Sequence, residues 1–229
     1  MAKPRTQLYM LMSLDGKIST GNNDSLDFDQ DLPKITGVSE GLYQYYDIEK
    51  TTDINSFNTG RVMAKIGTNE PNKKIDKIPV SFIIADNSHL TLDGVNNLCK
   101  RTRRLLLATA NNNHPGFRSK EDNLEMILYE DKINYTDLFN KLGSKYSMKR
   151  VTVQSGGNLN AVLLRAGLID KISVVITPII VGGKDVSTLV DGEAISSLKE
   201  LNKIVVLELI KVSKLKKSYL HLQYKVINK

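Results

Sequence analysis

The stretch VTVQSGGNLNAVLLRAGLID, residues 151–170, decides the fold that we expect for this chain. Residues 151–153 are all β-branched and predict a short buried strand of a parallel sheet. Gly156 and Gly157 follow almost at once. Two glycines allow a sharp turn, and they leave no Cβ between the main chain and a ligand. The stretch therefore begins as a strand that ends in a tight turn.

The second half of the stretch predicts a helix. Apolar residues recur at helical spacing from Leu159 to Ala166, Asn158 is a suitable N-terminal cap, and Gly167 is a typical C-terminal stop. A further strand is predicted over residues 171–176, which completes a βαβ unit. The amides of Gly156, Gly157 and Asn158 would then lie at a helix N-terminus, where phosphate groups bind.

A purely structural interpretation of the same pattern remains open, because a strand, two glycines and a helix also make an ordinary tight βα turn. The G-x-G-x-x-G pattern of dinucleotide-binding folds is absent, and no acidic residue stands at the distance that this pattern requires. Phosphate binding and a simple turn are both compatible with these residues.

Composition narrows the class of protein. The chain has 229 residues, 41% of them hydrophobic and 6% aromatic, and a net charge of +7. Its basic residues are mostly dispersed and lack interleaved aromatics, so we expect a lysine-rich surface and no nucleic-acid partner. The positive charge also suits an anionic, phosphorylated substrate. No apolar run approaches the length of a membrane span, so no membrane association is expected.

The single cysteine, Cys99, excludes an intramolecular disulfide and a cysteine zinc site. We expect no metal, a reducing compartment and a cytoplasmic protein, since no apolar segment of a signal peptide follows the first residues. Cys99 precedes a basic cluster that would lower its pKa, but a buried structural thiol is the simpler interpretation.

The rest of the chain predicts one α/β domain over residues 1–229, with a mostly parallel central sheet flanked by helices. The last two strands are closely linked, so they are expected to form an antiparallel hairpin. A polar segment, residues 21–31, is expected to be a loop. The expected strands are residues 7–14, 54–57, 78–85, 105–108, 125–129, 151–153, a strand from 171 that runs on to 181, 204–212 and 219–226; the expected helices are 39–50, 95–101, 134–146 and the one after Gly157.

Three segments together resemble a known family. Residues 12–18, MSLDGKI, are similar to its S-L-D-G-(K/R) opening, and Asp53 with TGR at 59–61 resembles its cofactor turn. The third segment, residues 154–183, is similar to the family pattern of two glycines, a helix, G-L-(V/I)-D and a later P…G-G. The chain resembles the pyrimidine reductases of riboflavin biosynthesis, including the C-terminal domain of the bifunctional deaminase-reductase. Their fold is the three-layer dihydrofolate-reductase-like fold, closed by an antiparallel hairpin.

The resemblance implies an oxidoreductase that uses NADPH. In this family, hydride reaches C1 of the opened ribose of a ribosylamino-pyrimidine 5′-phosphate and leaves a ribityl chain. The nicotinamide supplies the chemistry, and the protein positions the reactants. Arg61 would hold the 2′-phosphate as a planar fork. The cofactor-binding residues implied by the resemblance are Leu11, Ser13, Thr59, Gly60, Arg61, Asn87, Ser155, Gly156, Gly157, Asn158 and Leu159.

The resemblance implies that Ser25, Asp27 and Gln154 lie on the substrate side. Asp15 is the candidate for a general acid or for anchoring the pyrimidine, and a simple turn former is the alternative. Lys17 is the candidate contact for a substrate phosphate, and a solvated lysine is the alternative. Asp15 and Lys17 are therefore the predicted catalytic residues.

Two departures from the family pattern concern the substrate side. Gln154 stands where the family has a glutamate, so the hydrogen-bonding reach is kept and the charge is lost. Residues 64–71, AKIGTNEP, replace a segment that carries an acidic pair and a phosphate-binding arginine in the family. The zinc deaminase signature, H-x-E with P-C-x-x-C, is absent from the chain, so no deaminase activity is expected.

Three other interpretations stay open beside the leading one. They are a reductase of a pterin or another small carbonyl or imine compound, an NADPH-binding protein without turnover, and a nucleic-acid module, which we place last. Family members usually form homodimers. The apolar segment IVVLELIKV, residues 204–212, needs cover and agrees with a homodimer here.

Overall fold

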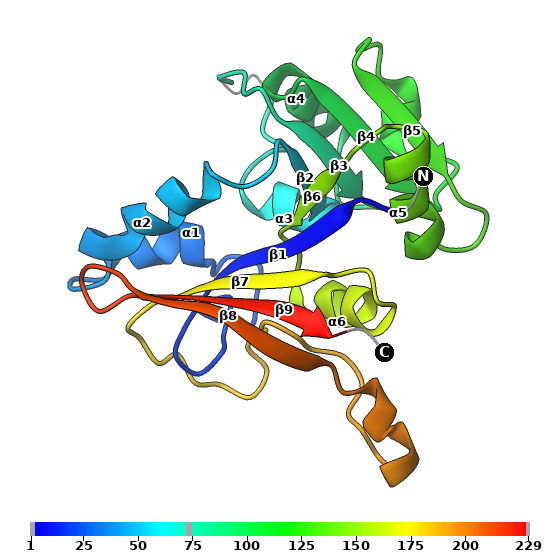
Figure 1. The fold of residues 1–229 in the computed structure, drawn as a ribbon. Helices are drawn as coiled ribbons and strands as arrows, with labels where there is room; N and C mark the ends of the chain where they lie inside the picture. The colour runs from blue at the N-terminus through cyan, green and yellow to red at the C-terminus, as the bar shows by residue number, and fades with distance from the viewer. Residues whose placement is uncertain (1–2, 72–74, 228–229) are drawn as a thin grey trace. The chain divides into compact units, whose positions relative to one another are not determined.

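The computed structural model describes residues 3–71 and 75–227, and its contacts divide the chain into two compact units (Figure 1). The first unit contains Asp53–Ser155 and the N-terminal end of the chain. The second contains Arg5–Thr52 and the segment that starts at Gly156. The chain thus passes from one unit to the other inside the stretch that decides the fold. The expectation of a single domain stays a prediction.

The sheet of the first unit is entirely parallel. Its strands lie in the order β5-β4-β3-β2-β6, and every neighbouring pair runs in the same direction. The apolar runs FIIA of β3 and LLLA of β4 suit strands that are covered on both faces. The bounds are β2 (Asn55–Thr59), β3 (Ser81–Ala85), β4 (Arg104–Thr109), β5 (Leu124–Leu128) and β6 (Arg150–Val153).

Helices cover this sheet and build its core. Strand residues Ile84, Leu105 and Leu107 pack with Leu98 and Cys99 of one helix. Burial raises the pKa of the Cys99 thiol to about 12, with a further contribution from Glu121, so this cysteine is structural, as the simpler interpretation predicted. The helices are α3 (Gly60–Lys65), α4 (Leu92–Arg101), α5 (Tyr135–Ser144) and the short 3₁₀ helix η2 (Pro115–Arg118).

The second unit has a mixed sheet with the order β1-β7-β9-β8. Strands β1 (Arg5–Met12) and β7 (Lys171–Ile176) are parallel. Strand β9 (Leu220–Ile227) is antiparallel to both β7 and β8 (Val206–Lys214). The predicted C-terminal hairpin is therefore confirmed. The other elements are α1 (Phe28–Asp31), η1 (Leu32–Lys34), α2 (Ser39–Glu49), α6 (Gly157–Arg165) and η3 (Leu198–Lys203).

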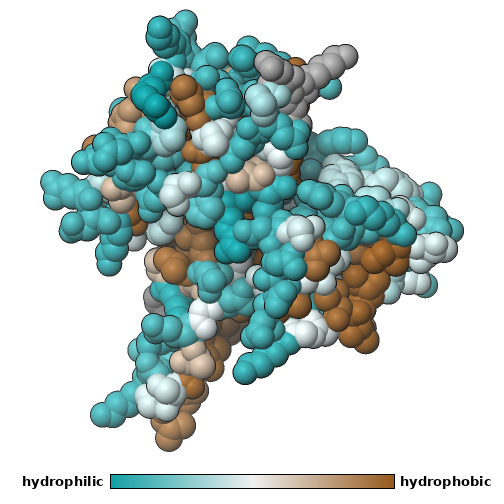
Figure 2. Space-filling view, turned by 180° about the vertical axis from the view of Figure 1, so that it is seen from behind, coloured by the Kyte–Doolittle hydropathy of each residue, from teal (hydrophilic) through white to brown (hydrophobic). Residues whose placement is uncertain are grey.

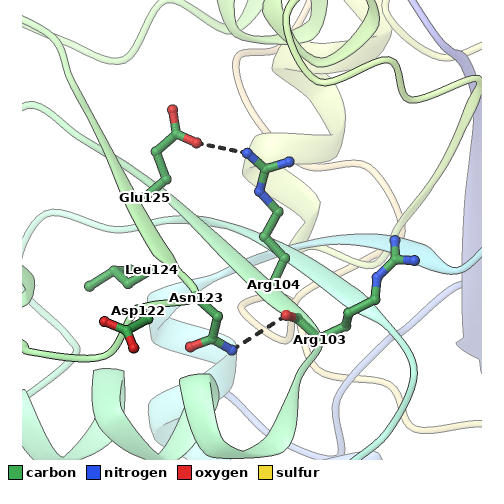
Figure 3. Close-up of a pocket in the computed structure, with 6 residues that line it drawn as sticks. All are labelled: Arg103, Arg104, Asp122, Asn123, Leu124 and Glu125. Atoms are coloured by element: carbon green, nitrogen blue, oxygen red, sulfur yellow. Dashed lines mark hydrogen bonds and ion pairs between the residues drawn. The ribbon is translucent and has the colours of Figure 1, made fainter.

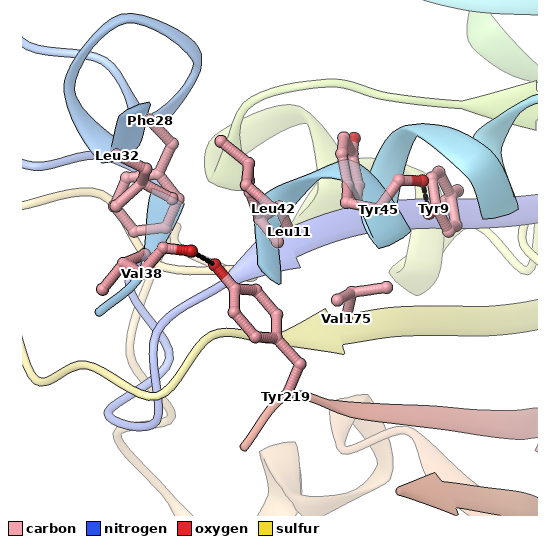
Figure 4. Packing of buried hydrophobic residues seen from close by; sticks show 9 residues of the cluster. All are labelled: Tyr9, Leu11, Phe28, Leu32, Val38, Leu42, Tyr45, Val175 and Tyr219. Carbon is pink, nitrogen blue, oxygen red and sulfur yellow. Dashed lines mark hydrogen bonds between the residues drawn. The ribbon is translucent and has the colours of Figure 1, made fainter. Parts of the chain in front are cut away.

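Tyrosine side chains join helix α2 to one face of this sheet by packing and hydrogen bonding (Figure 4). The rings of Tyr9 and Tyr45 are stacked with their centroids 4.9 Å apart, and the Tyr9 hydroxyl donates to the Tyr45 carbonyl at 2.6 Å. The Tyr219 hydroxyl donates to the carbonyl of Val38 at 2.8 Å (Figure 4). Both hydroxyls are buried, so these bonds prevent the cost of an unsatisfied polar group.

The α/β class and the mostly parallel sheet are confirmed, whereas three local predictions are wrong. Gly156, and not Asn158, is the cap of α6, because Asn158 already lies in the first helical turn. Strand β7 ends at Ile176 instead of running on to residue 181. The predicted loop at residues 21–31 contains α1, which Asp27 caps by accepting from the Asp29 amide.

Candidate functional site

In the first unit, polar residues gather where the parallel strands end. Ligands of open α/β sheets bind outside the carboxyl ends of the strands. Thr59 ends β2, Asp86 and Asn87 follow β3, and Gln154 follows β6. The pairing of these strands brings their carboxyl ends to one edge of the sheet. We refer to this edge as the carboxyl edge.

The predicted cofactor turn is the start of α3. Thr59 caps the helix, since its Oγ1 accepts from the Val62 amide at 3.3 Å. A Cβ on Gly60 would lie 2.2 Å from Cγ of Asp86, so only glycine fits there. Arg61 is exposed. The predicted residues Thr59, Gly60 and Arg61 therefore lie together, and the glycine is required by packing against Asp86.

Asp86 is the most strongly hydrogen-bonded carboxylate of the carboxyl edge, although it is only 3% exposed. It accepts from the backbone amides of His89 and Leu90, and the ring nitrogens of His89 and His114 lie 2.9 and 3.0 Å from it. Burial alone would raise the pKa of Asp86, but the hydrogen bonds from His114, Leu90 and His89 outweigh it and lower the pKa. Asp86 is therefore a buried, ionised group.

Both ring nitrogens of His114 take part in the hydrogen bonds around Asp86 and Gly116. Its Nδ1 accepts from the Gly116 amide at 3.0 Å, so the proton lies on Nε2 and is donated to Asp86. Asn87, predicted to contact the cofactor, has its Oδ1 occupied by the Ala110 amide at 2.8 Å. Asn87 thus joins the ends of β3 and β4, and its side-chain oxygen has a structural role.

Gln154 is joined to two buried polar residues of β2. The Ser56 hydroxyl lies 3.2 Å from Oε1 of Gln154, and Nδ2 of Asn58 donates to Oγ of Ser56 at 2.8 Å. Ser56 and Asn58 are 7% and 5% exposed, whereas Gln154 is half-buried. The row of polar groups therefore leads from the sheet interior to the carboxyl edge and ends at the Gln154 amide.

In the second unit, the two glycines before α6 differ. Gly156 is the cap, and a Cβ there would meet nothing within 4 Å. A Cβ on Gly157 would lie 2.3 Å from the Thr188 carbonyl oxygen and 2.3 Å from Oδ2 of Asp191. The amides of the first helical turn, including those of Asn158 and Leu159, have no acceptor within the helix. The space beside Gly156 and these amides suits an anion, whereas Gly157 is explained by packing.

Asp15 anchors a loop of the second unit. It accepts from the Ser13 hydroxyl at 2.5 Å and from the amides of Val181 and Gly182 at 3.1 and 2.7 Å. The bonds from Ser13 and Gly182 hold the pKa of Asp15 at about 2. Three hydrogen bonds that stabilise the ionised carboxylate do not fit a general acid and favour the turn-forming alternative.

Lys17 and Leu11 are both more enclosed than the sequence indicated. Lys17 is 9% exposed, and its Nζ donates to the Val186 carbonyl at 3.0 Å, so it is not a solvated lysine. Leu11 is buried in the core with Tyr9 and Val175, and its side chain faces that cluster. The predicted roles of both residues in binding stay predictions.

Two residues predicted on the substrate side have local partners. The Ser25 hydroxyl donates to Oδ1 of Asn23 at 2.6 Å and is exposed. Asp27 is the cap of α1 and is half-buried. Local hydrogen bonding explains both side chains, and their contact with substrate stays a prediction.

A surface pocket lies away from the carboxyl edge, at the opposite ends of β4 and β5 (Figure 3). It is lined by Arg103, Arg104 and residues 122–125. Arg104 is already paired with Glu125 at 2.8 Å. Burial alone would raise the pKa of Glu125, but bonds from Lys145, Tyr146 and Arg104 lower it to about 2. The charges of Arg104 and Glu125 in this pocket therefore satisfy each other.

Among residues 3–71 and 75–227, no cluster of histidine, cysteine and acidic side chains has the arrangement of a metal site. In the same part of the chain, no helix has both the length and the apolar character that crossing a bilayer requires.

The model of the RibD C-terminal domain family matches residues 4–220. This chain belongs to the RibD C-terminal domain family. The matched range takes in residues of both units.

Members and neighbours of the family agree with this assignment. A relative from Methanothermobacter thermautotrophicus is 26% identical over 213 residues, 86% of this chain and 88% of its own, and is named 2,5-diamino-6-ribosylamino-4(3H)-pyrimidinone 5′-phosphate reductase. The solved structure of Acinetobacter baumannii RibD superposes with a TM-score of 0.66 at 13% identity and covers 99% of this chain. The match spans 59% of the length of that RibD chain.

The predicted dihydrofolate-reductase-like fold is confirmed as well. Dihydrofolate reductase from Enterococcus faecalis, solved in complex with NADP(H), matches with a TM-score of 0.50 at 10% identity and covers 99% of both chains. At such low identity, the similarity of the chain to this enzyme and to A. baumannii RibD is evidence for a shared fold alone.

The sequence pattern did not predict two polar groups of this family member. The Asp86–His114 pair joins residues 28 positions apart, and nothing in the local sequence indicates that separation. The Ser56–Asn58 pair could have been predicted from the sequence, because NSFNT is unusually polar for a buried central strand. Polar residues at alternate positions of a buried strand indicate a hydrogen-bonded network, and this signal was available in the sequence.

Proposed function

We propose that this chain is an NADPH-dependent reductase of a ribosylamino-pyrimidine 5′-phosphate in riboflavin biosynthesis. Membership of the RibD C-terminal domain family carries the proposal, because the match covers residues 4–220 and the M. thermautotrophicus relative is named as such a reductase. When bound, NADPH supplies the hydride that reaches C1 of the opened ribose. The residues of this chain bind the two reactants, orient them and limit the access of water.

The structure offers a fit for the cofactor phosphates in the second unit. The open space beside Gly156 and the N-terminal amides of α6 suit a pyrophosphate. In the first unit, Thr59, Gly60 and Arg61 are the residues proposed to contact the cofactor. NADPH rather than NADH is proposed because Arg61 is exposed and its guanidinium suits a 2′-phosphate.

The first test is direct binding followed by turnover. NADPH and NADH are titrated into the protein by calorimetry, and NADPH absorbance is then followed with the ribosylamino-pyrimidine phosphate present. Binding of NADPH with substrate-dependent oxidation is expected. Binding without oxidation of NADPH would reject this substrate, and failure to bind either cofactor would reject the proposal.

Arg61→Ala tests the cofactor preference. The variant should lose about 1.5–3 kcal/mol of NADPH binding free energy, because a charge-assisted bond to the 2′-phosphate disappears. NADH binding, measured in the same calorimeter, should change little. An equal loss for both cofactors would remove this role from Arg61.

We also propose that the enzyme is a homodimer in the cytoplasm. The single cysteine agrees with a reducing compartment. Strand β8 carries apolar side chains that are 40–55% exposed, and Figure 2 shows hydrophobic surface along the β8 and η3 segment. These side chains are Val206, Leu207, Leu209, Ile210 and Val212. Sedimentation at micromolar concentration should give a dimer, Leu209→Lys should shift it to monomer, and a monomeric wild type would contradict the proposal.

A further inference from the structure

The loop that follows β3 carries an exposed imidazole, that of His89, which has no part in the proposed function. The chain has three histidines. His114 and His221 are buried, whereas the side chain of His89 is 47% exposed. Its position three residues after Asp86 places it at the carboxyl edge of the first unit. His89 is therefore the histidine that a ligand can reach from solvent.

One edge of the His89 ring is held by the buried carboxylate. Its Nδ1 lies 2.9 Å from Oδ1 of Asp86. An ionised carboxylate only accepts hydrogen bonds, so Nδ1 carries the proton and donates it. Nε2 lies on the opposite edge of the ring and has no hydrogen-bond partner among residues 3–71 and 75–227. The Nε2 edge is thus the one that a ligand can use.

The backbone of His89 is held as well as its ring. Its amide donates to both carboxylate oxygens of Asp86 at 3.1 Å, and its carbonyl accepts from Nδ2 of Asn69 at 2.8 Å. Asn69 also accepts from the amide of Thr91, the cap of α4, at 3.0 Å. Fixing an exposed side chain costs conformational entropy, which a preorganised contact recovers when a ligand binds. The extent of this bonding therefore indicates a binding role for the ring.

The carboxylate behind the ring decides what the Nε2 edge can bind. Once protonated, the ring offers a positively charged N–H at Nε2, and Asp86 balances that charge from the other edge. An anion at Nε2 favours the same protonated form, because it places a second negative charge beside the ring. The imidazolium then separates the anion from the buried carboxylate. The order carboxylate, imidazolium, anion suits a phosphate group.

The two reactants of the proposed reaction each carry a phosphomonoester. One is the 2′-phosphate of NADPH, and the other is the 5′-phosphate of the substrate. The local structure favours the 2′-phosphate, because Gly60 packs against the same Asp86 side chain that holds His89. Arg61, the residue proposed to contact the 2′-phosphate, directly follows Gly60.

We infer that His89 is a phosphate-binding residue, and that its Nε2 contacts a phosphomonoester of a bound reactant while Asp86 holds the ring. The inference rests on the proposed function and adds a binding residue to it. Because the 2′-phosphate and the 5′-phosphate have the same chemistry, the test below separates them.

Wild-type protein allows a test that needs no substitution, since His89 is the exposed histidine. Diethyl pyrocarbonate modifies accessible imidazoles, and mass spectrometry of the peptide that contains His89 gives the rate. Adenosine 2′-phosphate at about ten times its Kd should slow this reaction about tenfold, whereas adenosine should not slow it. Protection by ribose 5-phosphate instead would assign the contact to the substrate phosphate. Equal protection by adenosine and adenosine 2′-phosphate, or protection by none of the three compounds, would overturn the inference.

His89→Gln tests the same contact by calorimetry. The variant keeps a polar side chain and loses the positive charge, so the Kd for adenosine 2′-phosphate should rise roughly tenfold while the Kd for adenosine stays the same. Lys149→Gln is the matched control, because Lys149 is exposed and precedes the amino end of β6, opposite the carboxyl edge. It removes one positive charge at a distance and should leave both Kd values unchanged. Thermal unfolding of each variant shows whether it is folded.

Steady-state kinetics separate this inference from the proposed function. If the substrate phosphate is the ligand, His89→Gln should raise the substrate KM roughly tenfold with little change in kcat. An unchanged Kd for adenosine 2′-phosphate together with an unchanged substrate KM, in a folded His89→Gln protein, would overturn the inference and leave the reductase in place. A wild type that neither binds NADPH nor oxidises it would instead overturn the proposed function and this inference with it.

Discussion

Two turns of this protein share a pattern in sequence and differ in construction. Both the turn before α3 and the turn before α6 consist of a strand, a glycine and a helix start. At Gly60 the space above the glycine is filled by the buried carboxylate of Asp86. At Gly156 the same space is open, and the next residue, Gly157, is the one in close contact with other atoms. A glycine at a βα turn is thus required in one case by packing and in the other leaves room for a ligand.

The difference also concerns how firmly the neighbour is held. Asp86 accepts hydrogen bonds from two amides and lies beside two imidazoles, so it cannot move away from Gly60. The atoms that approach Gly157 belong to Thr188 and Asp191, which lie in a segment without regular helix or strand. We therefore expect the two turns to respond differently to the same substitution.

The largest effect is expected for Gly60→Ala. The added Cβ would lie 2.2 Å from Cγ of Asp86, and neither the strand end nor the carboxylate can yield. We expect a loss of about 3 kcal/mol in the free energy of unfolding, measured by urea denaturation. A loss below about 1 kcal/mol would mean that Asp86 moves freely and that the contrast between the turns is wrong.

Asp86→Asn should have the next largest effect, about 2–3 kcal/mol, because hydrogen bonds to a charged acceptor are replaced and His114 loses its ionised partner. The pH dependence sharpens this test. The pKa of Asp86 is lowered in the folded state, so its contribution is complete above the unfolded value of about 4 and is lost as pH falls below it.

The measurement is the free energy of unfolding of wild type and Asp86→Asn from pH 7 downward. The pKa values of Asp15 and Glu125 are also lowered, to about 2 in each case, so the wild-type slope alone does not isolate Asp86. The difference in free energy of unfolding between wild type and Asp86→Asn does isolate Asp86. This difference should shrink as the pH falls below about 4. A difference that is constant with pH would contradict an ionised Asp86.

Gly157→Ala should cost less, about 1–2 kcal/mol. Its Cβ would lie 2.3 Å from the Thr188 carbonyl oxygen, and we expect this segment, which hydrogen bonds hold without regular secondary structure, to shift more readily than the carboxylate at Gly60. Urea denaturation of Gly157→Ala and Gly60→Ala, measured side by side, compares their losses in free energy of unfolding. If Gly157→Ala proves the more destabilising of the two, the loop is held more firmly than the carboxylate.

These contrasts show why the sequence predicted the elements better than the site. The strands, the helices and the hairpin follow from periodicity, so the start of the strand at residue 171 was predicted correctly, although its end was placed too late. The glycine pairs were found, but their neighbours come from distant positions. Asp86 lies against Gly60 and Asp191 lies against Gly157 in the folded chain, although each pair is far apart in sequence. Local sequence contains no signal for such contacts.

The same reason explains Asp15 and Gln154. Asp15-Gly16 was correctly considered as a turn, but its carboxylate accepts from residues 181 and 182, which are far along the chain. Gln154 was noticed because it departs from the family pattern, whereas Ser56, which orients it, is 98 positions away. In each case the sequence shows the type of the residue, but it does not show which residue will be its hydrogen-bond partner.

Gly156→Ala should have the smallest effect on stability and the clearest effect on binding. Its φ of −70° is allowed for alanine, and its Cβ would meet nothing within 4 Å, so the free energy of unfolding should change by less than about 1 kcal/mol. The methyl group would occupy the space proposed for the cofactor pyrophosphate, so the Kd for NADPH should rise by about tenfold, a difference of about 1.4 kcal/mol. Calorimetric titration measures this Kd. A stable Gly156→Ala variant with unchanged NADPH affinity would show that the open glycine, like the closed one, belongs to the fold alone.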